Sequence, residues 1–160
     1  MTPQEAFDRH HRAVFDFAYR LTGRADVAED VTQECFLAFV RAPERFDAAR
    51  GSVRTYLFAI AWNLALKRYR DHGSEEPLPE ELAAREARSG IDVATAIAEL
   101  PPLQRESLVL FQYEGCTLEE IATVAGVDVG TVKARLHRAR ERLRRRLAPY
   151  RKVGNANGTV

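Results

Sequence analysis

The chain has 160 residues, of which 46% are hydrophobic and 29% charged, a balance typical of a globular protein with one domain or two small ones. The formal net charge of +1 hides an uneven distribution, because ten Lys or Arg and a single acid lie between Thr131 and Lys152, whereas acids dominate between Glu75 and Glu99. The N-terminus gives no secretory signal, no apolar run approaches the roughly 20 residues of a membrane span, and two distant cysteines predict neither a metal site nor a disulfide framework. We therefore expect a cytoplasmic protein without membrane insertion, and with a basic surface near its C-terminus.

Three helices are predicted in the first 72 residues. Thr2 and Glu5 form a capping box that begins the first helix, and Gly23 ends it. Asp26 and Glu29 suggest a second box for a helix that stops before the loop PERFDAARGS, and a third helix then runs to about RDHG. The apolar residues recur at helical spacing, so the following residues are expected to be buried: Phe7, His11, Val14, Ala18 and Leu21; Val27, Val31, Cys35, Ala38 and Phe39; and Val53, Leu57, Ile60, Ala61 and Leu64.

The rest of the chain predicts a linker and a second set of helices. Residues 73–91 are acidic and interrupted by Pro, Ser and Gly, which indicates a flexible linker with at most a short helix in EELAARE. Residues 92–150 contain the helical stretches DVATAIAEL, PLQRESLVLFQYEG and TLEEIATVA, and then a basic helix. In the second stretch the residues expected to face inward are Leu103, Ser107, Leu110 and Phe111. Residues 151–160 are predicted to be a disordered tail, and the whole is all-α, with domains at 1–72 and 92–150.

The basic C-terminal stretch has the anatomy of a helix-turn-helix. Its apolar residues, Val132, Leu136, Ala139, Leu143 and Leu147, form one helical face, and a basic row points away from it. A capped helix precedes it, Gly126 permits a tight turn, and small residues begin the second helix. The first turns of that helix can offer Lys133, Ala134, His137 and Arg138 to a major groove, and the later arginines suit phosphates. A solvated face or a protein-docking helix is the alternative for the basic helix alone.

Two features of the first half also suggest contacts with partners. Asp30, Gln33 and Glu34 share one polar flank of the second helix, although an ordinary solvated face would look the same. The third helix mixes aromatic and basic residues, which suit stacked unpaired bases and phosphates. For Phe58 and Trp62 the alternative is that they fill the core of a small lobe.

These patterns together resemble a known family. The stretch DVTQECFLAFVRAPERFDAARGSVRTYLFAIAWNLALKRYRD resembles region 2 of a bacterial sigma factor, and LPPLQRESLVLFQYEGCTLEEIATVAGVDVGTVKARLHRARERL resembles region 4. The short acidic joint makes the extracytoplasmic-function (ECF) group the best match. The resemblance implies a subunit that binds the clamp and flap regions of core RNA polymerase and directs promoter-specific initiation, controlled by an anti-sigma factor. No nucleophile–base pair, metal cluster or Gly-rich phosphate loop is found, so we expect no enzyme activity, cofactor or metal.

The resemblance implies roles for particular residues. Asp30, Gln33 and Glu34 are implied to bind RNA polymerase. The loop 46–52 is implied to bind a flipped base of the −10 promoter element. The −10 DNA contacts are implied for Phe46, Arg54, Tyr56, Trp62, Asn63, Lys67 and Arg70. Contacts to the −35 element are implied for Thr131, Lys133, Ala134, His137, Arg138 and Arg140. Ala134 and His137 depart from residues frequent in the family, so the −35 sequence cannot be carried over.

Two other functions compete with this one. A stand-alone DNA-binding regulator would use only the helix-turn-helix and would leave DVTQECF without a role. A sigma mimic that sequesters an anti-sigma factor needs no DNA-reading face, and the ten cations after Thr131 argue against it.

Overall fold

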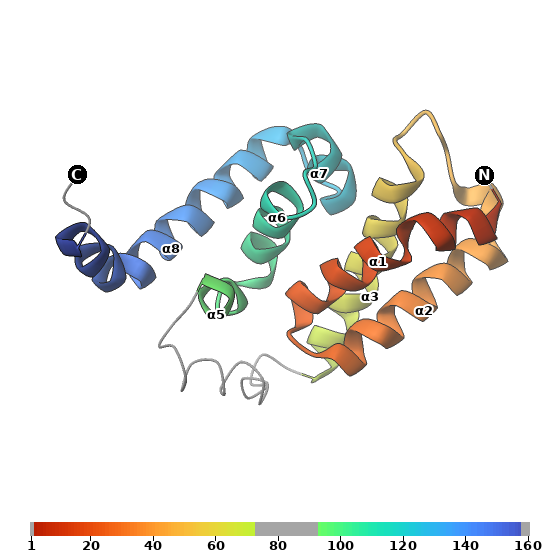
Figure 1. The fold of residues 1–160 in the computed structure, drawn as a ribbon. Coiled ribbons are helices and arrows are strands. Elements are labelled where there is room, and N and C mark those ends of the chain that lie inside the picture. The colour runs from red at the N-terminus through yellow and green to blue at the C-terminus, as the bar shows by residue number, and fades with distance from the viewer. Residues whose placement is uncertain (1, 73–92, 158–160) are drawn as a thin grey trace.

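The computed structural model describes residues 2–72 and 93–157, apart from the side chains of 69–72 and 149–157. These residues form two helical lobes (Figure 1), so the all-α prediction is confirmed. The first lobe contains α1 (Pro3–Thr22), α2 (Ala25–Arg41) and α3 (Val53–His72), and the second contains α5 (Val93–Ala98), α6 (Pro102–Gln112), α7 (Leu118–Ala125) and α8 (Val129–Asn157). The expected linker at 73–91, with the short helix in EELAARE, lies outside the described residues.

Helix α1 begins and ends as its sequence predicts. The Thr2 hydroxyl accepts a hydrogen bond from the Glu5 backbone N–H at 3.1 Å, the Glu5 carboxylate accepts one from the Thr2 N–H at 2.9 Å, and Gly23 ends the helix at a φ of 71°. The buried face differs from the prediction, because Phe7 and His11 are exposed and stack on each other with ring centroids 4.6 Å apart. Phe7 also packs edge-on against Phe36 of α2, with ring centroids 5.1 Å apart, but this contact leaves it 41% exposed.

Helix α2 lacks the capping box predicted from Asp26 and Glu29. Its N-cap residue is Arg24, which makes no side-chain cap, and Asp26 instead lies in the first turn and accepts hydrogen bonds from the Arg24 guanidinium at 3.0 and 3.3 Å. The helix thus begins two residues before the predicted position, so Asp26 lies past the N-cap. Phe36 is buried in place of the expected Ala38, and the 3-10 turn η1 (Pro43–Arg45) follows the helix.

Helix α3 packs against α1 and α2 within the first lobe and against α7 of the second lobe. Its first turn is held by Ser52, whose hydroxyl accepts a hydrogen bond from the Thr55 N–H at 3.1 Å. Leu57 and Ala61 are fully buried as predicted, whereas Val53, Ile60 and Leu64 are only half-buried.

The second lobe confirms the helix-turn-helix. Thr117 and Glu120 form the predicted capping box of α7, and Gly126 follows it at a φ of 69°. In α6 the buried residues are Glu106 to Leu110, and the predicted inward residue Leu103 is 44% exposed. Leu103 fails the prediction because it lies in the first turn of α6, before the helix enters the core.

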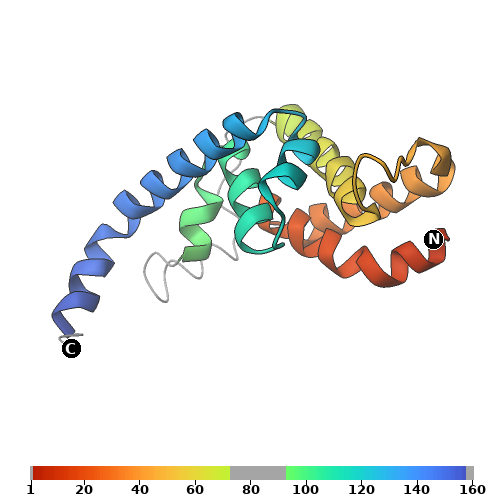
Figure 2. The same ribbon diagram turned by 90° about the horizontal axis from the view of Figure 1, so that it is seen from above.

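Helix α8 carries the basic sequence and extends beyond the rest of the second lobe (Figure 2). Val132, Leu136 and Ala139 are buried, and Leu143 and Leu147 are half-buried as the helix leaves the core. The helix continues to Asn157, so the backbone of 151–157 is helical where a disordered tail was expected.

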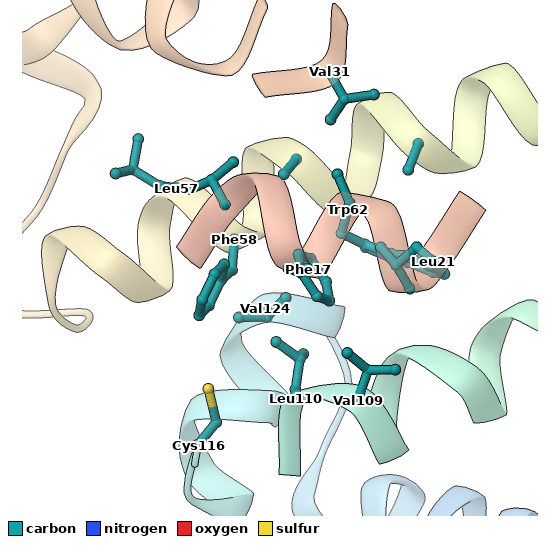
Figure 3. Close-up of a cluster of buried hydrophobic side chains, with 14 of the residues drawn as sticks. Phe17, Leu21, Val31, Leu57, Phe58, Trp62, Val109, Leu110, Cys116 and Val124 are labelled. Atoms are coloured by element: carbon teal, nitrogen blue, oxygen red, sulfur yellow. The ribbon is translucent and has the colours of Figure 1, made fainter. Parts of the chain in front are cut away.

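One hydrophobic core runs through both lobes. Phe17 of α1 and Phe58 of α3 contact each other with centroids 5.0 Å apart, and Figure 3 shows them facing Val109, Leu110 and Val124 of the second lobe. Helix α6 also packs on α1, and α7 packs on α3. The two lobes are therefore held together in this structure by buried apolar surface as well as by polar contacts.

Candidate functional site

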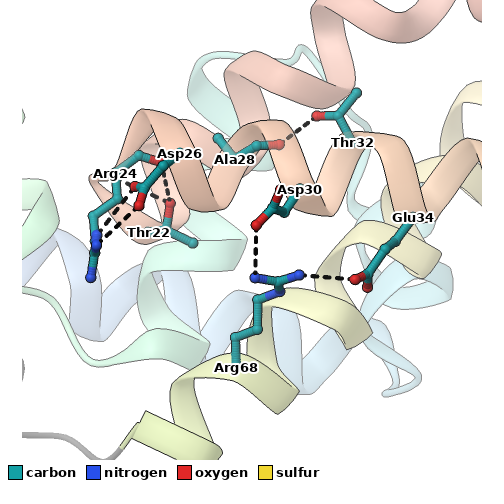
Figure 4. Close-up of polar contacts among 8 residues, drawn as sticks. All are labelled: Thr22, Arg24, Asp26, Ala28, Asp30, Thr32, Glu34 and Arg68. Carbon is teal, nitrogen blue, oxygen red and sulfur yellow. Dashed lines mark hydrogen bonds and ion pairs between the residues drawn. The ribbon is translucent and has the colours of Figure 1, made fainter.

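The predicted acidic flank of α2 forms an exposed surface that α3 supports from one side (Figure 4). The Arg68 guanidinium lies between two carboxylates, with Nη1 3.5 Å from Asp30 Oδ2 and Nη2 3.0 Å from Glu34 Oε1. Gln33 is exposed on the same flank. The flank continues into apolar side chains, because Leu37 and Val40 are 47% and 52% exposed. We refer to Asp30, Gln33 and Glu34 as the acidic face.

The residues expected at the −10 element do not share one environment. Asn63 and Lys67 are exposed on α3, and Phe46 is half-buried against Tyr56, with centroids 5.5 Å apart. Trp62 is 5% exposed, so the alternative reading holds for it and for Phe58: both rings fill the core, and Trp62 has no free face for a base in this state. The side chain of Arg70 lies outside the described residues.

Arg54, the remaining −10 candidate, is bound by the second lobe. Its Nη1 donates a hydrogen bond to the Glu114 carbonyl at 2.9 Å, its Nη2 lies 4.0 Å from Cys116 Sγ, and its guanidinium lies 5.4 Å from the centre of the Phe58 ring. Next to it, the Thr55 hydroxyl donates a hydrogen bond to Glu120 Oε2 at 3.0 Å. The first turn of α3 is thus covered by the segment that leads into the helix-turn-helix.

Other polar contacts complete the boundary between the lobes, which we call the seam. Arg20 of α1 lies 3.6 Å from Glu114 and 4.3 Å from the centre of the Tyr113 ring. Arg105 of α6 donates hydrogen bonds to the carbonyls of Leu21 and Leu100. Burial raises the pKa of Glu114, and the charge of Arg20 opposes this shift.

The predicted −35 residues lie together on α8. Lys133, His137, Arg138 and Arg140 are exposed and lie outside the buried stripe of that helix, whereas Thr131 and Ala134 are half-buried. The Arg140 guanidinium lies 5.4 Å from the centre of the Phe111 ring, so its stem follows the lobe surface. The row therefore presents cations and one imidazole to solvent, with room for a polyanion.

Two supporting residues were missed by the sequence analysis. Asp128 accepts a hydrogen bond from the Thr131 backbone N–H at 2.7 Å, which caps the start of α8; the Asp three residues before Thr is the signal that could have revealed it. Hydrogen bonds from Thr131 hold the pKa of Asp128 below its usual value. Glu106 is fully buried under α8, and burial raises its pKa to about 8, against the opposing charge of Arg135.

Comparison with known proteins agrees with this geometry. Sigma-70 region 2 matches residues 6–75, and sigma-70 region 4 matches residues 91–143. Two helical lobes with these regions define a sigma factor of the sigma-70 family. The chain is 34% identical to the ECF RNA polymerase sigma factor SigL of Mycobacterium tuberculosis, over 86% of this chain and 84% of that protein. It is 35% identical to SigE of Mycolicibacterium smegmatis over 91% of this chain, and spans 62% of that protein's length. The chain therefore belongs to the ECF group, whose members are transcription initiation factors and not enzymes.

Solved structures share the fold. CnrH, in complex with the cytosolic domain of CnrY, superposes with a TM-score of 0.73 at 28% identity, over 92% of this chain and 88% of that one. The sigma factor RpoE of Bartonella quintana, in complex with the anti-sigma factor NepR, gives a TM-score of 0.72 at 24% identity, over 91% and 96% of the two chains. Within the described residues, no helix of this protein is both long and apolar enough to cross a membrane.

Proposed function

We propose that this sigma factor docks on core RNA polymerase through the acidic face of α2, and reads −10 DNA with α3 and the loop before it. Helix α8 reads the −35 element, and the protein acts in the cytoplasm. The observation that carries the proposal is the exposed basic row of α8, formed by Lys133, His137, Arg138 and Arg140, which lies outside the buried stripe of that helix. A helix that is anchored on one face and cationic on the other, behind a capped helix and a glycine turn, is suited to a major groove.

Promoter reading by both lobes requires that the seam opens. Elements centred about 25 base pairs apart are separated by about 85 Å along B-form DNA, at 3.4 Å per base pair. In the structure the first turn of α3 is hydrogen-bonded to the residues that begin α7, so the two DNA-reading surfaces cannot span that distance. We infer that polymerase separates the lobes and holds them apart, and that their contacts then add through effective concentration.

The form seen in the structure, in which the seam contacts are made, is also a candidate target for an inhibitor; we call it the closed form. CnrH and RpoE are similar in fold, and both are seen in complexes, the latter with an anti-sigma factor. We propose that an anti-sigma factor binds this chain as well and stabilises its closed form. Such a partner needs only to bind the closed form more tightly than the open one to keep the protein inactive.

The test is reconstituted transcription from fragments of the protein's own genome with core polymerase. Glu34→Gln should weaken core binding, and Lys133→Ala should lower −35-dependent initiation and reduce the slope of log affinity against log salt by about 0.9. Arg12→Ala is the control, because that side chain is 85% exposed on α1, away from the acidic face and from α8. The proposal fails if no fragment supports specific initiation, or if both variants behave like the control.

A further inference from the structure

We propose that Arg68 is a positioning residue of the polymerase-docking surface, which holds the Asp30 and Glu34 carboxylates in the arrangement that polymerase meets. This inference rests on the proposed role of the acidic face. Arg68 belongs to α3 and the two carboxylates belong to α2, so the contact joins the docking helix to the helix that carries the −10 residues.

The geometry uses the fork of the guanidinium. Each terminal nitrogen pairs with one carboxylate: Nη1 lies 3.5 Å from Asp30 Oδ2, and Nη2 lies 3.0 Å from Glu34 Oε1 (Figure 4). Among the described residues Asp30 and Glu34 make no other side-chain hydrogen bond or ion pair, so Asp30 Oδ1 and Glu34 Oε2 remain able to accept hydrogen bonds from a partner. The side chain of Arg68 is only 26% exposed, whereas those of Asp30 and Glu34 are 61% and 50% exposed. The arginine is therefore the fixed member of the cluster, and the carboxylates are ordered by it.

Two effects of Arg68 on polymerase affinity oppose each other. Ordering the carboxylates in advance removes part of the conformational entropy that binding would otherwise cost, and this strengthens binding. The positive charge of Arg68 also reduces the net negative charge of the surface, which weakens the attraction of a basic partner. That second effect acts over distance and is screened within about 8 Å at physiological salt. The geometric effect is local, so we expect it to dominate near 0.15 M salt.

A second arginine on the same side of the lobe provides a matched control. Arg24 pairs with Asp26 at 3.0 Å, but both belong to the start of α2 and their side chains are 44% and 71% exposed. Neither touches the acidic face. Arg24→Gln removes one positive charge near the same helix and leaves the positions of Asp30 and Glu34 unchanged.

The experiment measures the affinity of the full-length protein for core polymerase at about 0.15 M salt. Arg68→Gln should raise the Kd about three- to fivefold, the range of an exposed ion-pair network. Arg68→Lys keeps the charge but cannot fork to both carboxylates, so it should weaken binding similarly. Arg24→Gln should leave the Kd unchanged. In a Glu34→Gln, Asp30→Asn background, Arg68→Gln should have no further effect, because Arg68 acts through those two residues.

Each contrary result overturns the proposal for a different reason. Tighter binding by Arg68→Gln would mean that charge neutralisation dominates. An unchanged Kd with a lowered melting temperature would leave Arg68 a purely structural role. A loss that persists in the Glu34→Gln, Asp30→Asn background would mean that Arg68 contacts polymerase itself. If that double variant binds core polymerase like the unmodified protein, the acidic face is not the docking surface, and the proposed function is what fails.

Discussion

Arg20→Gln should open the seam without unfolding either lobe. Arg20 belongs to α1 of the first lobe, and its partners Glu114 and Tyr113 follow α6 in the second. The substitution therefore removes contacts that exist only while the lobes are together. The hydrophobic core keeps all its side chains.

The contacts of Arg20 set the size of the effect. The Glu114 side chain is 8% exposed, and loss of its partner leaves a carboxylate whose pKa is already raised by burial. Because the Arg20 side chain is 37% exposed, we take about 1–1.5 kcal/mol for the ion pair, well below the 3–5 kcal/mol of a fully buried one. The stacking of Arg20 on Tyr113 adds about 0.5–1 kcal/mol. A total of about 2 kcal/mol corresponds to roughly a 30-fold increase in the ratio of open to closed protein.

The native cysteines report on this equilibrium. Cys116 lies at the seam, is 3% exposed and is within 4.0 Å of Arg54, so opening exposes it. Cys35 is fully buried inside the first lobe and donates a hydrogen bond to the Leu57 carbonyl, so opening leaves it covered. Alkylation followed by mass spectrometry should show Cys116 modified roughly 30-fold faster in Arg20→Gln, at an unchanged rate for Cys35.

The control for this measurement is Arg12→Gln, which removes an 85% exposed cation of α1 whose ion pair, with Asp16, lies within that helix. Small-angle scattering should show a larger radius of gyration for Arg20→Gln than for Arg12→Gln. Equal Cys116 rates in the two variants would refute the reasoning, because the seam would then not depend on the Arg20 contacts. Equal acceleration of Cys35 and Cys116 would refute it as well, because the first lobe itself would then be unfolding.

Two further predictions concern the second lobe. The pKa of Glu106 is raised to about 8 in the folded protein from an ordinary value of 4.5, so the folded state keeps a proton that the unfolded chain loses. The stability that this proton contributes is therefore fully present below pH 4.5 and is lost as the pH rises to about 8. Glu106→Gln should remove this loss, so the free energies of unfolding of the variant and the unmodified protein, measured from melting curves, should diverge by roughly 1–4 kcal/mol between pH 5 and 8. Thr117→Ala should lower the free energy of unfolding by about 1 kcal/mol, because it removes the 3.1 Å hydrogen bond from the Glu120 N–H, whereas Thr117→Ser should restore most of it in denaturant titrations. A flat pH dependence of the Glu106→Gln difference, or equal stabilities of the Ala and Ser variants, would contradict these two expectations.

Local signals in the sequence predicted the local structure well. The boxes at Thr2 and Thr117 and the glycine turn at Gly126 were read correctly because a cap is decided within four residues. The box at Asp26 was wrong because the helix begins two residues earlier, at Ala25, which places Asp26 inside the first turn. Helical spacing gave the right periodicity but not the depth of burial, so Phe7 was expected inside and is 41% exposed.

Contacts between distant segments could not be predicted in this way. Nothing in the sequence near Arg54 indicates that its acceptor is the carbonyl of Glu114, 60 residues later, because a backbone carbonyl carries no sequence signal. The same holds for Arg105 and the Leu21 carbonyl. The link from Arg68 to Asp30 and Glu34 was equally hidden, although all three residues lie in stretches that had been singled out. Sequence patterns were thus enough to find the candidate residues. Their contacts and burial in the free protein could be seen only in the structure.

The acceptors in the seam suggest how promoter DNA and the second lobe compete for Arg54. Its partner is the Glu114 carbonyl, a neutral acceptor, and water replaces such a bond at a net cost of only about 1 kcal/mol. A DNA phosphate is charged, and a charge-assisted bond to arginine is roughly twice as strong as a neutral one. In the proposed open state, with the second lobe moved away, we therefore expect Arg54 to gain more from a phosphate than from the Glu114 carbonyl. The polar contacts and the apolar surface shared by the two lobes hold the free protein closed, and we expect binding to polymerase and DNA to offset both.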